Sequence, residues 1–252
     1  MQRSAASLAS MAFICLAGAL HGEDRRVAFP GAAGYGAFAR GGRGGDVYIV
    51  TDLGDSGAGS LRHGLESATG PRTIVFEISG TIELESPLVI ERPFMTIAGQ
   101  TAPGDGITLK GRELAIRNTH DIILRYVRLR PGDVQCERGF TGDALSVDGV
   151  TDVMIDHVSM SWSIDETLAI RRSGAVTVQW SFITESLNDS CHPKGPHSCA
   201  TLLGPNPDGR LTIHDCLFAH HVRRSPKPTS RGERRKEDTH LFEDFAGLGQ
   251  DA

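Results

Sequence analysis

The chain has 252 residues, an ordinary share of hydrophobic residues and a net charge of -5. Its length suffices for one domain with a substantial core, and its acidic balance argues against a nucleic-acid-binding protein. The 30 glycines and 12 prolines, with few aromatic residues, favour an all-β chain with many tight turns. Such a chain would bind an acidic polymer only where local cations or a metal offset the charge.

The first 22 residues have the pattern of an export signal. Arg3 supplies a basic start, residues 8–20 form an apolar run, and Ala17-Gly18-Ala19 offers small residues for cleavage. The run is shorter than the ~20 residues that cross a bilayer comfortably. A buried N-terminal helix is the alternative. We therefore predict a signal peptide over 1–22 and a secreted or periplasmic protein with no membrane span.

A Gly-rich region over 27–60 is followed by short segments with the character of β-strands. Ser60 is a good N-cap residue, and residues 60–66 predict one short helix behind it. Strand residues bounded by Gly or Pro then recur along the chain. The predicted strands of this part cover 47–51, 73–78, 81–84 and 88–90.

Four segments after residue 120 share one pattern, in which an apolar residue is followed by others two and seven positions later. They are Ile122, Leu124 and Leu129; Val153, Ile155 and Met160; Val176, Val178 and Ile183; and Leu211, Ile213 and Phe218. The segments begin 31, 23 and 35 residues apart, which fits a solenoid with constant strands and variable loops. A sandwich would need regular hairpin turns, and a TIM barrel would need intervening helices. The pattern predicts a parallel β-helix whose loops can form a groove for an extended polymer.

Motifs between residues 27 and 228 resemble the exported pectate lyases, the polysaccharide lyase family 1 branch of the pectin lyase-like β-helices. The most specific are Ile97 to Gly104, Gly142 to Ser146, Ile155-Asp156-His157, Ser161 to Glu166 and Thr184 to Leu187. The resemblance implies a right-handed, single-stranded parallel β-helix over 23–228 with a short N-terminal capping helix. It also implies a monomeric pectate lyase that acts on acidic polysaccharide, namely polygalacturonate or pectin.

Eliminative cleavage of a uronate polymer requires positive charge on the carboxylate and a base at the adjacent carbon. Calcium, which takes hard oxygen ligands, can supply the charge. By resemblance, Asp143 and Asp165 match calcium-binding positions, and Glu166 is a third ligand or supports the other two. Adjacent coils can bring the three together, because parallel strands lie ~4.8 Å apart. The further acids of some relatives are absent at the positions of Thr141 and Ala169.

Three basic residues complete the predicted site. Arg224 matches the catalytic Arg-x-Pro of the family and is the predicted base, with Arg223 as the alternative if the register differs by one. Lys194 resembles the substrate-binding lysine, although it can equally be a surface loop residue, and Lys227 is a second substrate-binding candidate. A guanidinium is normally protonated, so an arginine base requires nearby cations in a dry site, or alkaline pH.

The mature chain would keep four cysteines, which permit disulfides in an oxidising compartment. Cys191 and Cys199 flank a Pro/Gly loop and can staple it, but other pairings with Cys136 and Cys216, and four free thiols, stay open.

Histidines in the chain have less specific patterns. Asp156 and His157 are adjacent on a strand and should point to opposite faces, so we interpret them as structural, with Asp156 bonding neighbouring turns. The spacing of His214, His220 and His221 fits no common zinc motif.

Two departures from the family bear on activity. His214-Asp215-Cys216 stands where the family has His-His-Asn, and residues 229–252 form a charged tail without strand pattern. We expect a disordered tail and a domain incomplete at its C-terminal end. The alternatives are a β-helix glycoside hydrolase that pairs Asp143 with Asp165 or Glu166, and an exported carbohydrate-binding module without activity.

Overall fold

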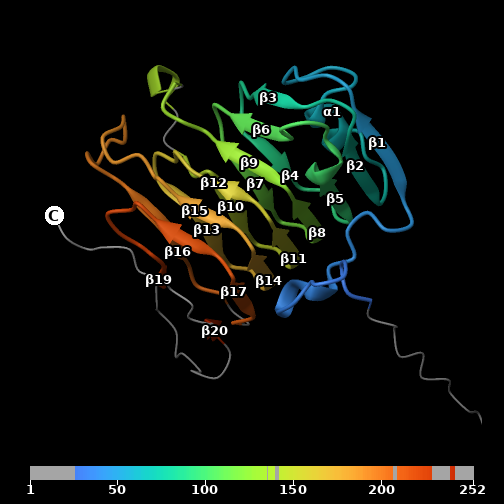
Figure 1. The fold of residues 1–252 in the computed structure, drawn as a ribbon. Helices are drawn as coiled ribbons and strands as arrows, with labels where there is room; N and C mark the ends of the chain where they lie inside the picture. The colour runs from blue at the N-terminus through green and yellow to red at the C-terminus, as the bar shows by residue number, and fades with distance from the viewer. Residues whose placement is uncertain (1–25, 135, 140–141, 207–208, 229–238, 242–252) are drawn as a thin grey trace, which may run out of the picture.

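A computed structural model describes residues 26–134, 136–139, 142–206, 209–228 and 239–241. Over these residues the chain forms a parallel β-solenoid of about five turns with little helix (Figure 1). Each full turn gives one strand to each of three sheets, which we call A, B and C. The prediction of an all-β parallel β-helix is confirmed.

The described strands fall into three sheets of eight, six and six members. Sheet A contains, in spatial order, β1 (Asp46–Val50), β2 (Arg72–Phe76), β5 (Met95–Ala98), β8 (His120–Arg125), β11 (Thr151–Asp156), β14 (Gly174–Gln179), β17 (Leu211–His214) and β20 (Thr239–Leu241). Sheet B contains β3 (Gly80–Glu83), β6 (Ile107–Lys110), β9 (Val127–Arg130), β12 (Ser159–Met160), β15 (Phe182–Thr184) and β18 (Leu217–Ala219). Sheet C contains β4 (Leu88–Ile90), β7 (Leu114–Arg117), β10 (Leu145–Asp148), β13 (Glu166–Arg171), β16 (Cys199–Leu203) and β19 (Lys227–Pro228).

The apolar repeat of the sequence becomes the core of the solenoid. In sheet A, Ile122 pairs in register with Val153, which pairs with Val176, and Val176 pairs with Leu211. The second and third positions of the repeat align in the same way in sheets A and B. Identical spacing within each repeat thus stacks equivalent apolar side chains, and these side chains form the buried interior.

Helical structure in the described part is short. Helix α1 (Leu61–Glu66) begins after Ser60, whose Oγ accepts a hydrogen bond from the His63 N–H at 3.2 Å. Three 3-10 turns are η1 (Tyr35–Phe38), η2 (Gly99–Thr101) and η3 (Cys136–Arg138). The helix and its N-cap lie where the sequence predicts them, whereas a capping role for α1 and the right hand of the coil stay predictions. None of the helices among the described residues is long and apolar enough to cross a membrane.

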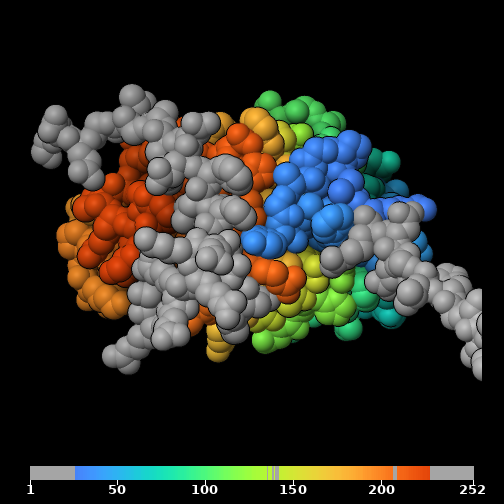
Figure 2. All heavy atoms as spheres, turned by 90° about the horizontal axis from the view of Figure 1, so that it is seen from below, coloured from blue at the N-terminus to red at the C-terminus, as the bar shows by residue number. Residues whose placement is uncertain are grey.

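The Gly-rich N-terminal segment lies against the outer face of sheet A. The Gly36 N–H donates to Thr177 Oγ1 at 2.9 Å, and the Tyr35 N–H donates to Thr212 Oγ1 at 3.2 Å. A Cβ on Gly36 would collide with the carbonyl oxygen of Val153, so only glycine permits this close approach. Figure 2 shows this blue segment against the green, yellow and orange coils.

The turn from sheet A to sheet B is made by single residues in the left-handed conformation. His157 has φ 53° at this corner, and its Nδ1 lies 2.9 Å from Asp156 Oδ2. The prediction that the two side chains point apart is therefore wrong, because His157 is a corner residue rather than a strand residue. Asp156 does bond neighbouring turns as predicted, since it accepts from Arg125 Nε and Gln179 Nε2, both at 2.7 Å.

Both predicted terminal segments fall largely outside the described residues. The signal peptide over 1–22 lies wholly outside them. Within the tail over 229–252, β20 pairs in parallel with β17, which corrects the expectation of a tail without a strand. The open edge of a strand offers backbone donors and acceptors to any segment, so such pairing requires no apolar alternation.

Candidate functional site

The predicted site residues come from equivalent places in successive coils. Loops 131–144, 161–165, 185–198 and 220–226 all lead from sheet B into sheet C. They end next to β10, β13, β16 and β19, which are neighbours in sheet C (Figure 1). Asp143, Asp165, Lys194 and Arg224 lie one on each loop. Parallel stacking of the coils therefore brings loop residues that are far apart in sequence to one corner.

Three carboxylates meet at this corner. Asp143, Asp165 and Glu166 each offer an oxygen, and these oxygens all lie within 4.8 Å of one another. The Glu166 N–H donates to Asp143 Oδ1 at 3.0 Å and so holds Asp143 against β13. Asp143 and Glu166 are buried, whereas the side chain of Asp165 is 27% exposed. The cluster is thus open to solvent on the Asp165 side.

Burial shapes the electrostatics of Asp143. Its pKa lies well above the ordinary value, because burial disfavours the charged carboxylate and because Asp165 and Glu113 add negative charge nearby. Arg171, whose Nη2 lies 3.6 Å from Asp143 Oδ2, opposes that shift. Burial also raises the pKa of Glu113, against the effect of Arg117 at 2.5 Å. Asp143 and Asp165 lie close together and Asp143 is buried, so this place favours a bound positive charge.

Arg224 contacts the cluster directly. Its guanidinium forms an ion pair with Glu166, although β16 lies between β19 and β13 in sheet C. The pair therefore reaches across one strand, and the Arg224 carbonyl is held there by the Thr201 N–H at 2.6 Å. Arg223, the alternative base, turns the other way and donates through Nη2 to Pro196 O at 2.7 Å.

The two predicted substrate lysines are exposed residues outside the carboxylate cluster. Lys194 is exposed on loop 185–198, where its N–H donates to His192 Nδ1 at 3.2 Å. Lys227 is exposed at the start of β19, opposite Leu202. Two positions carry acids in some relatives but not in this chain. Of these, Ala169 is buried on β13, and Thr141 lies outside the described residues.

A second group of donors adjoins Asp165, and sequence reasoning missed it. His197 Nε2 lies 2.8 Å from Asp165 Oδ1, and Asp165, His197 and Cys199 offer donor atoms that all lie within 4.8 Å of one another. His192 stacks on His197 with ring centroids 3.8 Å apart. The signal in the sequence was His197-x-Cys199 at the start of a strand. Two donors do not make a site, and the third donor, Asp165, comes from the neighbouring coil.

The disulfide of the described chain joins Cys136 to Cys191, with 5.7 Å between the Cα atoms. The suggested Cys191–Cys199 staple is therefore wrong. Cys199 starts β16 and is buried beside Asp165, whereas Cys191 remains in the exposed loop. Cys216 is also a free thiol, and burial raises its pKa to about 12. The bridge ties the loop before β10 to the loop before β16.

The three C-terminal histidines do not converge on a common point. His214 Nδ1 lies 2.7 Å from Asp215 Oδ2, and His220 Nδ1 lies 3.1 Å from Glu185 Oε1. His221 is held by Ser186 and by the Ile183 carbonyl. None of these three described histidines belongs to a group of donors that could hold a metal ion.

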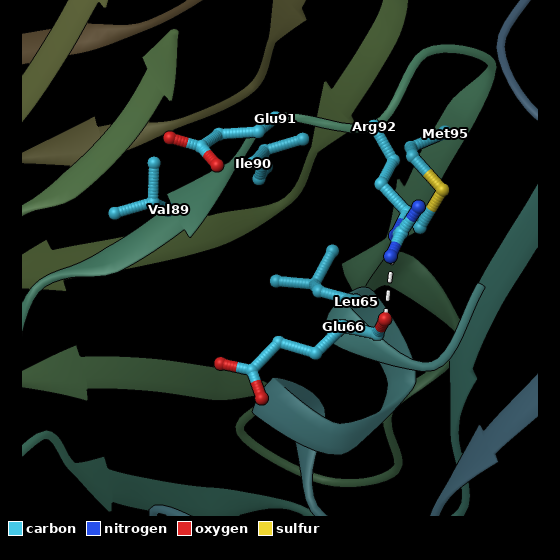
Figure 3. A pocket seen from close by; sticks show the side chains of 7 residues that line it. All are labelled: Leu65, Glu66, Val89, Ile90, Glu91, Arg92 and Met95. Atoms are coloured by element: carbon cyan, nitrogen blue, oxygen red, sulfur yellow. Dashed lines mark hydrogen bonds between the residues drawn. The ribbon is translucent and has the colours of Figure 1, made fainter.

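A separate hollow of about 390 Å³ lies near α1, β4 and β5 (Figure 3). It is lined by Leu65, Glu66, Val89, Ile90, Glu91, Arg92 and Met95. Arg92 Nε donates to the Glu66 carbonyl at 3.3 Å within it. None of the predicted site residues lines this hollow, so the loop corner is the better candidate site.

Comparison with known proteins places these features in a family context. No family model matches the chain. A probable pectate lyase C of Aspergillus terreus is 40% identical over 219 residues, which are 86% of this chain and 48% of that protein. The corresponding protein of Emericella nidulans is 42% identical over 203 residues, 80% of this chain and 44% of that protein. The chain thus spans about half the length of the curated relatives it matches.

Solved structures show the same coil architecture. Jun a 1, the major allergen from cedar pollen, matches with a TM-score of 0.61 and 24% identity, over 78% of this chain and 60% of that one. A pectate lyase of Bacillus sp. N165 in complex with trigalacturonate matches with a TM-score of 0.52 and 18% identity, over 75% and 62%. The chain is thus similar in sequence to curated pectate lyases over most of its own length, and the solved structures share its parallel β-helix fold.

Proposed function

We propose that this protein is an exported pectate lyase that cleaves α-1,4-polygalacturonate by β-elimination. The observation that carries the proposal is the contact of Arg224 with a cluster of three carboxylates at one loop corner. A pectate lyase relationship over most of the chain supports the same reaction. The Bacillus structure with trigalacturonate supports an oligogalacturonate as the substrate class.

Asp143, Asp165 and Glu166 are the residues that would hold calcium. Their oxygens are hard donors within 4.8 Å of one another, which suits a cation that takes oxygen ligands in irregular geometry. The pKa of Asp143 is raised first by burial and then by the negative charge of Asp165 and Glu113, and a bound cation would favour the charged carboxylate against both. The residues therefore fit the ion. When bound, calcium supplies positive charge for a substrate carboxylate and so makes the neighbouring C–H more acidic.

Arg224 would accept the proton from the carbon next to the uronate carboxylate. In the described arrangement Glu166 occupies its guanidinium, so Arg224 must leave that ion pair before it can serve as a base. Guanidinium groups hold their proton in the usual pH range, and the elimination rate should therefore rise toward alkaline pH. In the resting site, Glu166 would hold the Arg224 side chain at the corner through this ion pair.

Lys194 and Lys227 would bind uronate carboxylates on either side of the reacting sugar. Both are exposed, Lys194 on loop 185–198 of this corner and Lys227 at the start of β19, three residues after Arg224. An ammonium group is a mobile point charge that suits a flexible polymer. The positive charge they provide is local, which reconciles an acidic substrate with a net charge of -5.

The decisive experiment measures ultraviolet absorption of the unsaturated product from polygalacturonate, with calcium and with chelator, at several alkaline pH values. We expect calcium-dependent product whose formation is lost in Arg224→Ala. Arg172→Ala is the matched control, because Arg172 is also a left-handed corner residue but is itself exposed and pairs with half-buried Asp148 instead. Saturated reducing ends that form regardless of chelator would identify a hydrolase. Polymer binding without turnover by the folded protein would identify a binding module.

Calcium binding has its own test, independent of turnover. Calcium should raise the midpoint of thermal unfolding of the wild type, since a ligand that binds the folded state stabilises it. Asp143→Asn should remove that increase, whereas Asp148→Asn, on the strand β10 that follows the loop of Asp143, should keep it. An equal calcium effect in both variants would rule out the proposed ligands.

A further inference from the structure

We propose that Asp165, His197 and Cys199 form a second metal site, selective for a borderline-soft divalent transition metal such as Zn²⁺. The three residues come from two neighbouring coils, Asp165 from the loop before β13, His197 from the end of loop 185–198 and Cys199 from the start of β16. One donor atom from each lies within 4.8 Å of the other two. The site adjoins the carboxylate cluster and shares Asp165 with it.

The donor set identifies the class of metal. Thiolate and imidazole ligands select zinc and related ions, whereas calcium takes oxygen ligands almost exclusively. Carboxylate, imidazole and thiolate together can fill three corners of a tetrahedron and leave one position open. Zinc bonds are ~2.0 Å long to nitrogen and ~2.3 Å long to sulfur. The three donor atoms already lie within 4.8 Å of one another, so small side-chain movements would bring them to these distances from one ion.

His197 provides the second, independent indication of a ligand. Its side chain is 3% exposed, and its Nε2 lies 2.8 Å from Asp165 Oδ1 without hydrogen-bond geometry, so it has no hydrogen-bond partner among the described residues. A buried ring nitrogen without a partner is unfavourable. Asp165 Oδ1 is likewise buried without a hydrogen bond. Two ligand atoms without hydrogen bonds lie side by side here, and a metal ion with bonds of ~2.0 Å at tetrahedral angles would bind both once they separate from 2.8 Å to ~3.3 Å.

The neighbouring groups are compatible with such an ion. His192 stacks on His197 with an interplanar angle of 7° and limits the rotation of that ring. Arg223 Nη2 lies 3.4 Å from His197 Nδ1 and also donates to Pro196 O at 2.7 Å. Metal binding at Nε2 places the ring proton on Nδ1, so Arg223 would keep its bond to Pro196 and its hydrogen bond to Cys199.

Metal binding at this site involves no change of oxidation state. The Cys199 thiol loses its proton to solvent and forms the metal–sulfur bond, while His197 and Asp165 donate lone pairs. The ion enters from the side of Asp165, whose side chain is 27% exposed, because Cys199 is fully buried. This binding does not depend on the proposed lyase activity.

The test uses the full chain, freed of metal by a chelator and titrated with Co²⁺ as a spectroscopic substitute for Zn²⁺. We expect one equivalent of Co²⁺ to produce a thiolate-to-cobalt charge-transfer band in the near ultraviolet, and Zn²⁺ to displace it. Cys199→Ser should abolish the band. Cys216→Ser is the matched control, because Cys216 is also a free thiol with a histidine and an aspartate next to it in sequence.

Further variants keep the result decisive if Cys199→Ser does not fold. His197→Gln should retain a thiolate band but weaken Co²⁺ binding at least about 10-fold. Asp143→Asn, which would remove a proposed calcium ligand, should keep the thiolate band while losing the calcium effect on thermal unfolding, so failure of the two sites can be told apart. No band in the wild type, a band that survives in Cys199→Ser, or one lost in Cys216→Ser would overturn the proposal.

Discussion

Asp156 offers a test of how neighbouring coils are held together. Its side chain is fully buried and accepts from Arg125 on β8 and from Gln179 on β14, so it joins three strands of sheet A. Gln179 in turn accepts from the Ala33 N–H at 3.1 Å, and the Arg125 guanidinium lies 3.6 Å from the centre of the Phe29 ring. One carboxylate thus supports both the stacking of coils and the attachment of the N-terminal segment.

Replacing Asp156 by alanine should lower the free energy of unfolding by about 3 kcal/mol. Removal of one partner from a buried ion pair costs about 3–5 kcal/mol, since the remaining charge is left without compensation. The lower end applies because the Arg125 side chain is 18% exposed and keeps its contact with the aromatic ring of Phe29. A loss of this size is a large part of the ~5–15 kcal/mol that stabilises a typical domain.

Equilibrium unfolding in urea measures the effect, with Asp148→Ala as the matched control. Asp148 also pairs with an arginine, but Arg172 is exposed to solvent, and exposed pairs contribute little. The control should therefore unfold close to the wild-type midpoint. If Asp156→Ala lost less than about 1 kcal/mol, or no more than the control, the carboxylate would not be the link between coils that its contacts suggest.

Three other predictions concern the scaffold around the site. Gly36→Ala should destabilise the protein by roughly 1–3 kcal/mol, since the added Cβ meets the Val153 carbonyl; an unchanged thermal midpoint would contradict it. Loss of the disulfide in the double variant Cys136→Ser, Cys191→Ser should cost about 4 kcal/mol in urea unfolding, as expected for a separation of 55 residues. Burial and the neighbouring charge of His220 lower the pKa of His221, so its contribution to stability is complete above the ordinary value of ~6.5 and is lost as pH falls through the folded-state pKa. His221→Gln should therefore flatten the decline of stability measured by urea unfolding between neutral and acid pH.

The sequence alone determined the coil architecture, because a solenoid repeats one local rule. Apolar residues with the same internal spacing, as at Val153 and Ile155, must stack on their counterparts once the strands are parallel. The same rule brought Asp143 and Asp165 together, since each precedes a strand of sheet C. Ser60 likewise marked the start of α1 by a contact within its own turn.

Only the tertiary structure decided contacts that depend on loop conformation across coils. The Cys136–Cys191 bridge, the pairing of Arg224 with Glu166 across β16, and the approach of His197 and Cys199 to Asp165 all join different turns. Loop length varies from coil to coil, so sequence spacing carries no information about where such side chains meet. Strand positions follow from local periodicity, whereas the chemistry at the loop corner follows from the path of each loop in space.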